Sequence, residues 1–264
     1  MELEELSISN LLEILTENWQ KPKELLEISK DYDDTNVQVT IYESCVVLIS
    51  ANIESGIKQI AKSWIDDYNK FVGASQANNS LMKAVQDSYY EDKGFNQKYR
   101  EKIKNLHKDN NIPIDANCIT TNLKNPKPDT FIKFFSKVGE KKFLERINSE
   151  QLSDLFSSNS DERDPIKEMI LKKIDILKNN PMSSNEELLA KLNLNYQGSN
   201  AWKTFLDELV KARNKVAHGN EEQITLTKIK VKDFIEKAEY FQYLTVLNLY
   251  QIFLDDYNES ILIV

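Results

Sequence analysis

The longest periodic run of apolar residues in this chain extends from Val37 to Tyr68. Its apolar side chains recur every three or four residues, which is the repeat of one face of an α-helix. They are Ile41, Cys45, Ile49, Ile53, Ile57, Ile60 and Trp64, and Val46, Val47 and Leu48 widen the face. A helix with so broad an apolar face is buried on much of its circumference, so this run predicts a central helix on which other helices pack.

The composition favours helices over strands in the rest of the chain. Six Gly and six Pro among 264 residues are few, while 41% hydrophobic and 29% charged residues suit a globular helical protein. A sheet protein would need turn signals about every 8–12 residues, and these are missing. The sequence therefore predicts an all-α protein.

Breaks between the periodic segments suggest three parts. We expect residues 1–36 to form an N-terminal helix, interrupted near Pro22, that packs on the main bundle. Residues 37–72 and 186–264 would form the helical core of that bundle. The region 73–185 would be an insertion of several helices, one of which is an uninterrupted amphipathic helix over residues 130–147.

A second amphipathic helix is predicted from about residue 200 to 218, in the stretch AWKTFLDELVKARNKVAHGN. Gly198 and Ser199 offer a turn and an N-cap before it, and Gly219 offers a left-handed stop after it. On an ideal helix Arg213 lies about 40° from the centre of the apolar face, where a guanidinium needs a carboxylate, a subunit interface or a bound anion. His218 lies about 140° from Arg213. Either the last turn unwinds, or a second copy of the chain brings its own pair alongside.

The residues Arg213-Asn214-Lys215-Val216-Ala217-His218-Gly219 resemble the R-x4-H motif of the HEPN superfamily, in its RNxxAHG form. This resemblance implies a HEPN-like helical bundle and, for many members, a metal-independent ribonuclease that works as a dimer. It also implies a supporting acidic residue on the neighbouring helix, which is Glu43 or Glu54 in this chain. Prokaryotic toxins and defence effectors are common in the superfamily, so an antitoxin or activating protein is an expected partner.

The side chains of this motif suit the cleavage of RNA without a metal. RNA carries its own nucleophile, the 2′-hydroxyl group, and needs a base, an acid and a cation for the charge that grows on phosphorus. His218 suits proton transfer because imidazole titrates near neutrality, and Arg213 suits a phosphate clamp because its planar fork binds two oxygens. Asn214 can bind the phosphate or orient the imidazole. An acid and a base together need two histidines, which favours a homodimer with one composite site.

A different reading of the same residues stays open. The chain could be a catalytically inactive HEPN module that binds RNA, a nucleotide or a protein, with Arg213 and His218 in packing or interface roles. Glycine-rich phosphate loops, a nucleophile elbow and metal-spaced His or Cys clusters are missing from the sequence. We therefore expect neither a cofactor nor a metal.

The charge is unevenly distributed along the chain. The net charge is −8, but residues 93–146 carry 13 Lys and Arg against 6 Asp and Glu, a local charge of +7. This segment is either a phosphate-facing surface or a solvated, lysine-rich insertion. His107 lies in it without a partner nearby in the sequence, and we expect it to be an incidental surface residue.

The sequence also predicts a cytoplasmic protein with no membrane contact. Cys45 and Cys118 are too few for a disulfide framework, which favours a reducing environment. The N-terminus begins with acidic residues, unlike a secretory signal. No apolar run approaches the length of about 18 residues that a membrane span needs.

Overall fold

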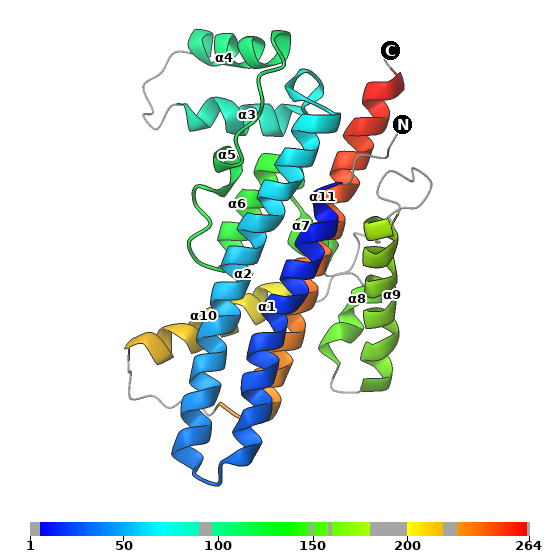
Figure 1. The fold of residues 1–264 in the computed structure, drawn as a ribbon. Helices are drawn as coiled ribbons and strands as arrows, with labels where there is room; N and C mark the ends of the chain where they lie inside the picture. The colour runs from blue at the N-terminus through cyan, green and yellow to red at the C-terminus, as the bar shows by residue number, and fades with distance from the viewer. Residues whose placement is uncertain are drawn as a thin grey trace.

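The computed structural model of the protein describes residues 6–89, 97–147, 150–157, 160–179, 200–218 and 226–262. All regular elements in these ranges are helices and none is a strand, which confirms the predicted all-α class. Three long helices lie side by side along the molecule: α1 (Ile8–Ile28), α2 (Thr35–Phe71) and α11 (Lys228–Leu262) (Figure 1). Within these ranges, no helix combines the length and hydropathy needed to cross a membrane.

The central helix α2 contacts α1, α10 and α11. The predicted apolar face is buried, with 0% exposure at Cys45, Ile49, Ile53, Ile57, Ile60 and Trp64. Val47 is 42% exposed, although we expected it to widen this face. It lies two residues from both Cys45 and Ile49, and two residues turn a helix by about 200°, so its side chain is on the opposite side.

The first helix continues through Pro22, so the predicted interruption there is wrong. A proline inside a helix leaves the carbonyl group four residues earlier without its usual N–H partner. Here that carbonyl belongs to Asn18, and it accepts a hydrogen bond from Asn52 Nδ2 of α2 at 2.9 Å. The neighbouring helix thus supplies the missing donor, which a local sequence pattern does not reveal.

The helices α2 and α11 approach each other closely at Gly56. A Cβ atom on Gly56 would lie 2.1 Å from Nε2 of Gln242, a side chain that is 1% exposed. Gln242 donates to the Asn52 carbonyl at 2.6 Å and accepts from Trp19 Nε1 at 2.9 Å. One glutamine therefore joins all three long helices, and only glycine leaves room for it.

We expect Gly56→Ala to lower the free energy of unfolding by about 1–4 kcal/mol. The added methyl group overpacks a buried site and displaces the acceptor of Trp19 Nε1, which outweighs the gain of about 1 kcal/mol in helix propensity. Urea denaturation measures the change. In a Gln242→Ala background the same substitution should have a smaller effect, and an equal effect in both backgrounds would contradict this account.

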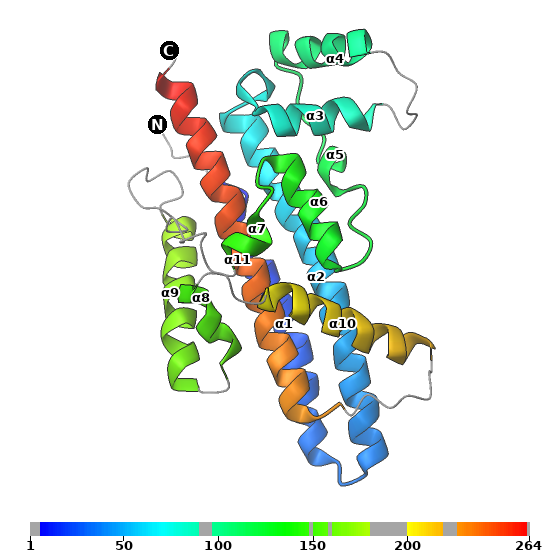
Figure 2. The same cartoon turned by 180° about the vertical axis from the view of Figure 1, so that it is seen from behind.

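The region between α2 and α10 forms shorter helices, which flank the three long helices on two sides (Figure 2). They are α3 (Asn79–Ser88), α4 (Gln97–Asp109), α5 (Asn117–Thr120), α6 (Pro128–Val138), α7 (Phe143–Arg146), α8 (Glu150–Ser153) and α9 (Ser160–Asn179), with the 3₁₀ turns η2 (Ala74–Gln76) and η3 (Asp154–Phe156). A layer of shorter helices, α3 to α6, lies on the side of α2, whereas α9 packs on α11 and α1. The 3₁₀ turn η1 (Ser29–Asp31) joins α1 to α2. The single helix predicted over residues 130–147 is two helices. Gly139 separates them with a φ of 107°, the left-handed conformation typical of a helix stop.

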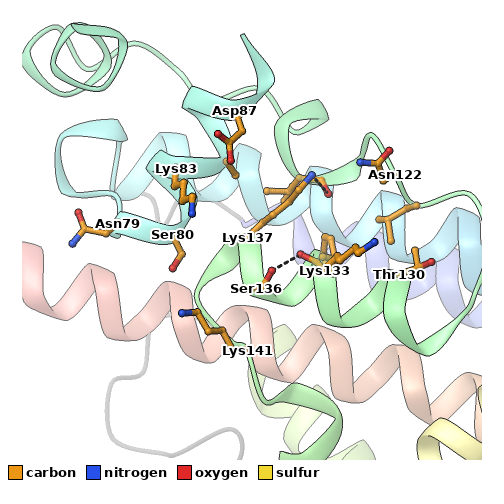
Figure 3. Close-up of a pocket in the computed structure, with 14 residues that line it drawn as sticks. Asn79, Ser80, Lys83, Asp87, Asn122, Thr130, Lys133, Ser136, Lys137 and Lys141 are labelled. Carbon is orange, nitrogen blue, oxygen red and sulfur yellow. Dashed lines mark hydrogen bonds between the residues drawn. The ribbon is translucent and has the colours of Figure 1, made fainter. Parts of the chain in front are cut away.

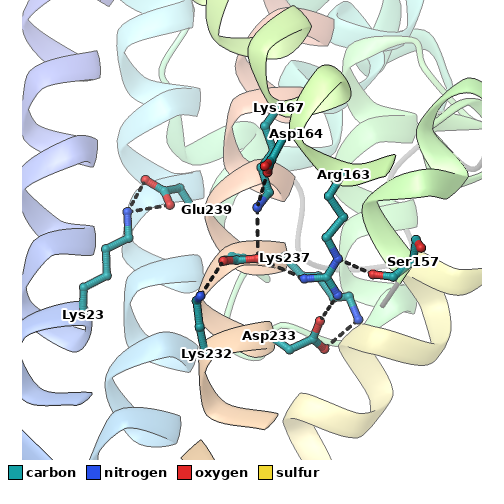
Figure 4. A network of polar contacts seen from close by, with 10 residues as sticks. Lys23, Ser157, Arg163, Asp164, Lys167, Lys232, Asp233, Lys237 and Glu239 are labelled. Carbon is teal, nitrogen blue, oxygen red and sulfur yellow. Dashed lines mark hydrogen bonds and ion pairs between the residues drawn. The ribbon is translucent and has the colours of Figure 1, made fainter. Parts of the chain in front are cut away.

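A network of ion pairs fixes α9 to α11 (Figure 4). Arg163 bonds Asp233 at 2.8 Å and Glu236 at 3.0 Å, and Lys167 lies 3.2 Å from Glu236. Lys23 of α1 reaches Glu239 of α11 at 2.7 Å. Because these charges are paired within the chain, their role is to hold α9 and α1 against α11.

Candidate active site

The helix that carries the R-x4-H spacing is α10 (Ala201–His218), which confirms the predicted span of about 200–218. It crosses α2 near the middle of that helix, and its C-terminal end extends past α2, away from α1 and α11 (Figure 2). Asn200 caps its N-terminus, since its Oδ1 accepts from the Lys203 backbone N–H at 3.1 Å. The expected cap, Ser199, and the expected turn residue, Gly198, lie outside the described residues, as do all residues from 186 to 197.

The indole of Trp202 anchors the first turn of α10 in the core. It is fully buried and donates from Nε1 to the Ile147 carbonyl at 2.8 Å. Its ring lies 4.9 Å from Phe156 and 5.6 Å from Phe241, centroid to centroid. Further along, Leu206, Leu209 and Ala212 are buried, so the helix is held along its length up to the residue before Arg213.

Arg213 is half-buried, and its predicted place is inside the apolar face, about 40° from its centre. Its Nη1 donates to Oδ1 of Asn214 at 3.1 Å. A carboxylate partner for the Arg213 charge is not found in the described part of the chain, and a subunit interface or a bound anion could also satisfy it.

His218 is the last residue of α10, while its side chain, Gly219 and Asn220 lie outside the described residues. The backbone is helical from Arg213 through His218. The two residues therefore lie about 140° apart around the helix axis, as on an ideal helix. The negative end of the helix dipole lies at this terminus and favours the charged forms of cationic side chains there.

The two candidate supporting carboxylates lie on α2. Glu54 lies near the middle of α2 and pairs with Lys58 at 2.7 Å. Glu43, half-buried, lies about 16 Å closer to the start of the helix. Neither has a hydrogen bond or ion pair with Arg213 in the described part of the chain, and a supporting role for either one stays a prediction.

The prediction that His107 is an incidental surface residue is wrong, because its side chain is only 3% exposed. Its Nδ1 lies 3.1 Å from the Ile112 carbonyl oxygen, and its Nε2 lies 3.1 Å from the Tyr89 hydroxyl. A carbonyl only accepts, so Nδ1 carries the proton of that bond. His107 ties α4 to the end of α3 and to the loop that follows α4. These partners are 5 and 18 residues away in the sequence, so a local pattern does not predict this role.

The two cysteine side chains are unsuited to nucleophilic catalysis near neutral pH. Both cysteines are free and buried, and burial raises the pKa of Cys45 to about 11 and that of Cys118 to about 12. Their thiols are therefore protonated and poor nucleophiles. In the described ranges, no three His, Cys, Asp or Glu side chains come together in a way that could hold a metal ion.

Comparison with known proteins gives one match. A family model described as RiboL-PSP-HEPN matches residues 18–249. The matched span begins within α1 and ends within α11, so it includes α10 and also the layer of shorter helices. No curated protein and no solved structure matches the chain.

Proposed function

Because the chain belongs to the RiboL-PSP-HEPN family, we propose that it is a metal-independent endoribonuclease. Membership confirms the resemblance drawn from residues Arg213 to Gly219, and HEPN proteins are generally associated with RNases. The observation that carries the proposal is the place of the R-x4-H spacing. It lies at the end of a well-anchored helix, where the Arg213 guanidinium has no carboxylate partner in the described chain.

In the proposed reaction the RNA 2′-oxygen attacks the adjacent phosphorus atom and the bond from phosphorus to the 5′-oxygen breaks. One His218 takes the proton of the 2′-hydroxyl group, and a second His218 gives a proton to the leaving 5′-oxygen. Arg213 binds the phosphate oxygens as negative charge grows on them. Asn214, which already contacts the Arg213 guanidinium, holds that side chain in position. Glu43 and Glu54 remain the candidates for a supporting acid.

The proposed active form is a homodimer with one composite site. The helical backbone through His218 supports this, since one straight helix directs Arg213 and His218 about 140° apart. A twofold axis near the end of α10 would bring two copies of each side chain to one phosphodiester. The half-buried Arg213, which pairs with no carboxylate among the described residues, fits such an interface or a bound phosphate.

We further propose that the enzyme acts in the cytoplasm as a toxin or effector in a prokaryotic defence or toxin–antitoxin system. This rests on the family, and an antitoxin or activating protein is its expected partner. The alternative is an inactive HEPN module that binds RNA, a nucleotide or a protein. The hydrogen bond from Arg213 Nη1 to Asn214 Oδ1 favours this alternative, because it uses one N–H donor of the guanidinium within the same helix.

The test is to incubate the purified protein with total RNA and EDTA, with and without added cell extract as a source of an activator. We expect cleavage that survives chelation and leaves 2′,3′-cyclic phosphate and 5′-hydroxyl ends, the products of attack by the 2′-oxygen. Cleavage that EDTA abolishes would contradict a metal-independent reaction. The absence of cleavage in every arm would favour the inactive module.

A further inference from the structure

A cavity of about 800 Å³ lies between α3 and α6, in the layer of shorter helices (Figure 3). Its floor is apolar and consists of Ala84, Ile119, Leu123 and Phe134, all buried. Its volume is within the range of about 300–1,000 Å³ that is typical of ligand sites. It is thus large enough for a ligand of the size of a nucleotide or a short stretch of strand.

Four lysines line this cavity: Lys83 from α3, Lys133 and Lys137 from α6, and Lys141 from the segment after α6. Lys83, Lys133 and Lys141 are exposed, and their ammonium groups have no hydrogen bond or ion pair among the described residues. Lys137 is held in place, because its Nζ donates to the Cys118 carbonyl at 2.9 Å. Burial lowers the pKa of Lys137.

The one acidic residue that lines the cavity does not neutralise these lysines. Asp87 is ion-paired with Arg100 of α4, so its charge is already balanced. Several ammonium groups around one hollow repel each other unless an anion lies between them. The surrounding charge therefore favours a ligand with phosphate or similar groups.

The arrangement of the lysines favours several phosphates in a row over a single one. Lys133 and Lys137 are four residues apart on one helix, about 6 Å along the axis, and Lys141 follows beyond Gly139. Figure 3 shows Lys133 near the Thr130 end of the cavity and Lys141 at the Asn79 end. Asn79 and Ser80 of α3, Asn122 of the segment between α5 and α6, and Thr130 of α6 add hydrogen-bonding groups around the cavity.

We propose that the α3–α6 cavity binds the phosphate groups of a single RNA strand, as a contact separate from the R-x4-H motif of α10. This inference rests on the proposed function for the identity of the strand. Three of the four lysines belong to the basic segment 93–146, whereas Lys83 lies outside it and joins the others only through the packing of α3 on α6. The cavity would thus fix the substrate while the motif cuts it.

The experiment measures binding of a fluorescent single-stranded RNA of about 12 nucleotides in a His218→Ala background, so that cleavage does not interfere. The test variant is Lys133→Gln/Lys141→Gln, which leaves the structural Lys137 in place. The control is Lys21→Gln/Lys172→Gln, which removes two exposed lysines of α1 and α9 and changes the net charge equally. Anisotropy is recorded from about 50 to 300 mM salt.

We expect the test variant to bind RNA roughly tenfold more weakly, with a salt dependence of log K smaller by about 1.4, the value for two lost single-strand contacts. The control should stay within about twofold of the parent protein. Equal affinities for the test and control variants would overturn the proposal. So would displacement of the RNA by a mononucleotide at equal phosphate concentration, because the site would then be for a free nucleotide.

The same variants distinguish this proposal from the nuclease proposal. In one outcome, the lysine variant with native His218 cuts RNA at the parental rate and binds it unchanged. This would support the nuclease proposal and contradict the proposal for the cavity. In the other outcome, the native protein cuts no RNA, but the lysine variant binds RNA more weakly. This would contradict the nuclease proposal and support the RNA site in the cavity.

Discussion

Replacing His218 by alanine is expected to lower the rate of RNA cleavage by roughly 10²–10⁴-fold, the usual contribution of general acid–base catalysis. In the proposed composite site the substitution removes both the acid and the base of the dimer, so the upper part of that range is expected. Arg213→Ala should cost roughly 10²–10³-fold, because it removes the cation that stabilises the developing negative charge. Arg213→Lys should restore only part of this loss, since an ammonium group lacks the planar fork. Initial rates on a defined RNA measure all three.

A matched control for these variants is Lys211→Ala. Lys211 lies on the same helix, is exposed and has no hydrogen bond or ion pair among the described residues. Its loss changes the charge of α10 without touching the motif, so the cleavage rate should stay close to that of the native protein. If His218→Ala and Arg213→Ala cut RNA as fast as Lys211→Ala, the assignment of the active site is wrong.

Mixing the native protein with its His218→Ala variant then tests the composite site. After random exchange of subunits in an equal mixture, about one quarter of the dimers are fully native. A site that needs both histidines should show about a quarter of the activity per dimer, whereas independent sites should show about half. A value near half would mean that each chain cuts RNA by itself.

The second large effect is expected at Trp202, far from the chemistry. Trp202→Ala should lower the free energy of unfolding by about 3–5 kcal/mol, the usual loss when a buried large aromatic side chain is truncated. The indole is fully buried against Phe156 and Phe241, and its N–H bonds the Ile147 carbonyl at 2.8 Å. The substitution thus leaves a cavity and an unpaired carbonyl under the first turn of α10.

Urea denaturation measures this effect, and Trp202→Phe separates its two causes. Phenylalanine keeps most of the ring contacts but loses the hydrogen bond, so its destabilisation should be clearly smaller. An unchanged unfolding midpoint for Trp202→Ala would show that α10 is held by its later residues alone. Cleavage below the melting temperature should fall as well, because the anchored helix positions the motif.

Some features of this fold follow from local sequence patterns, and others depend on contacts between distant segments. The span of α10 and the burial of the α2 face follow from the helical repeat, since burying one face of a helix needs only an apolar period. The continuity of α1 through Pro22 did not follow, because Asn52 of another helix satisfies the Asn18 carbonyl. The burial of His107 and the break at Gly139 were missed as well, because a neighbouring element or a local left-handed turn decides each of them.

The sequence by itself determined the all-α class, the motif helix and the family, because these depend on residue period and on spacing within one segment. Only the tertiary structure decided which charges are paired. It joins Arg163 to Asp233 and Lys23 to Glu239, and it leaves Arg213 and three cavity lysines without a carboxylate in the described chain. Coulomb energy depends on the distance between charges in space, and a helical chain brings together residues that are dozens of positions apart.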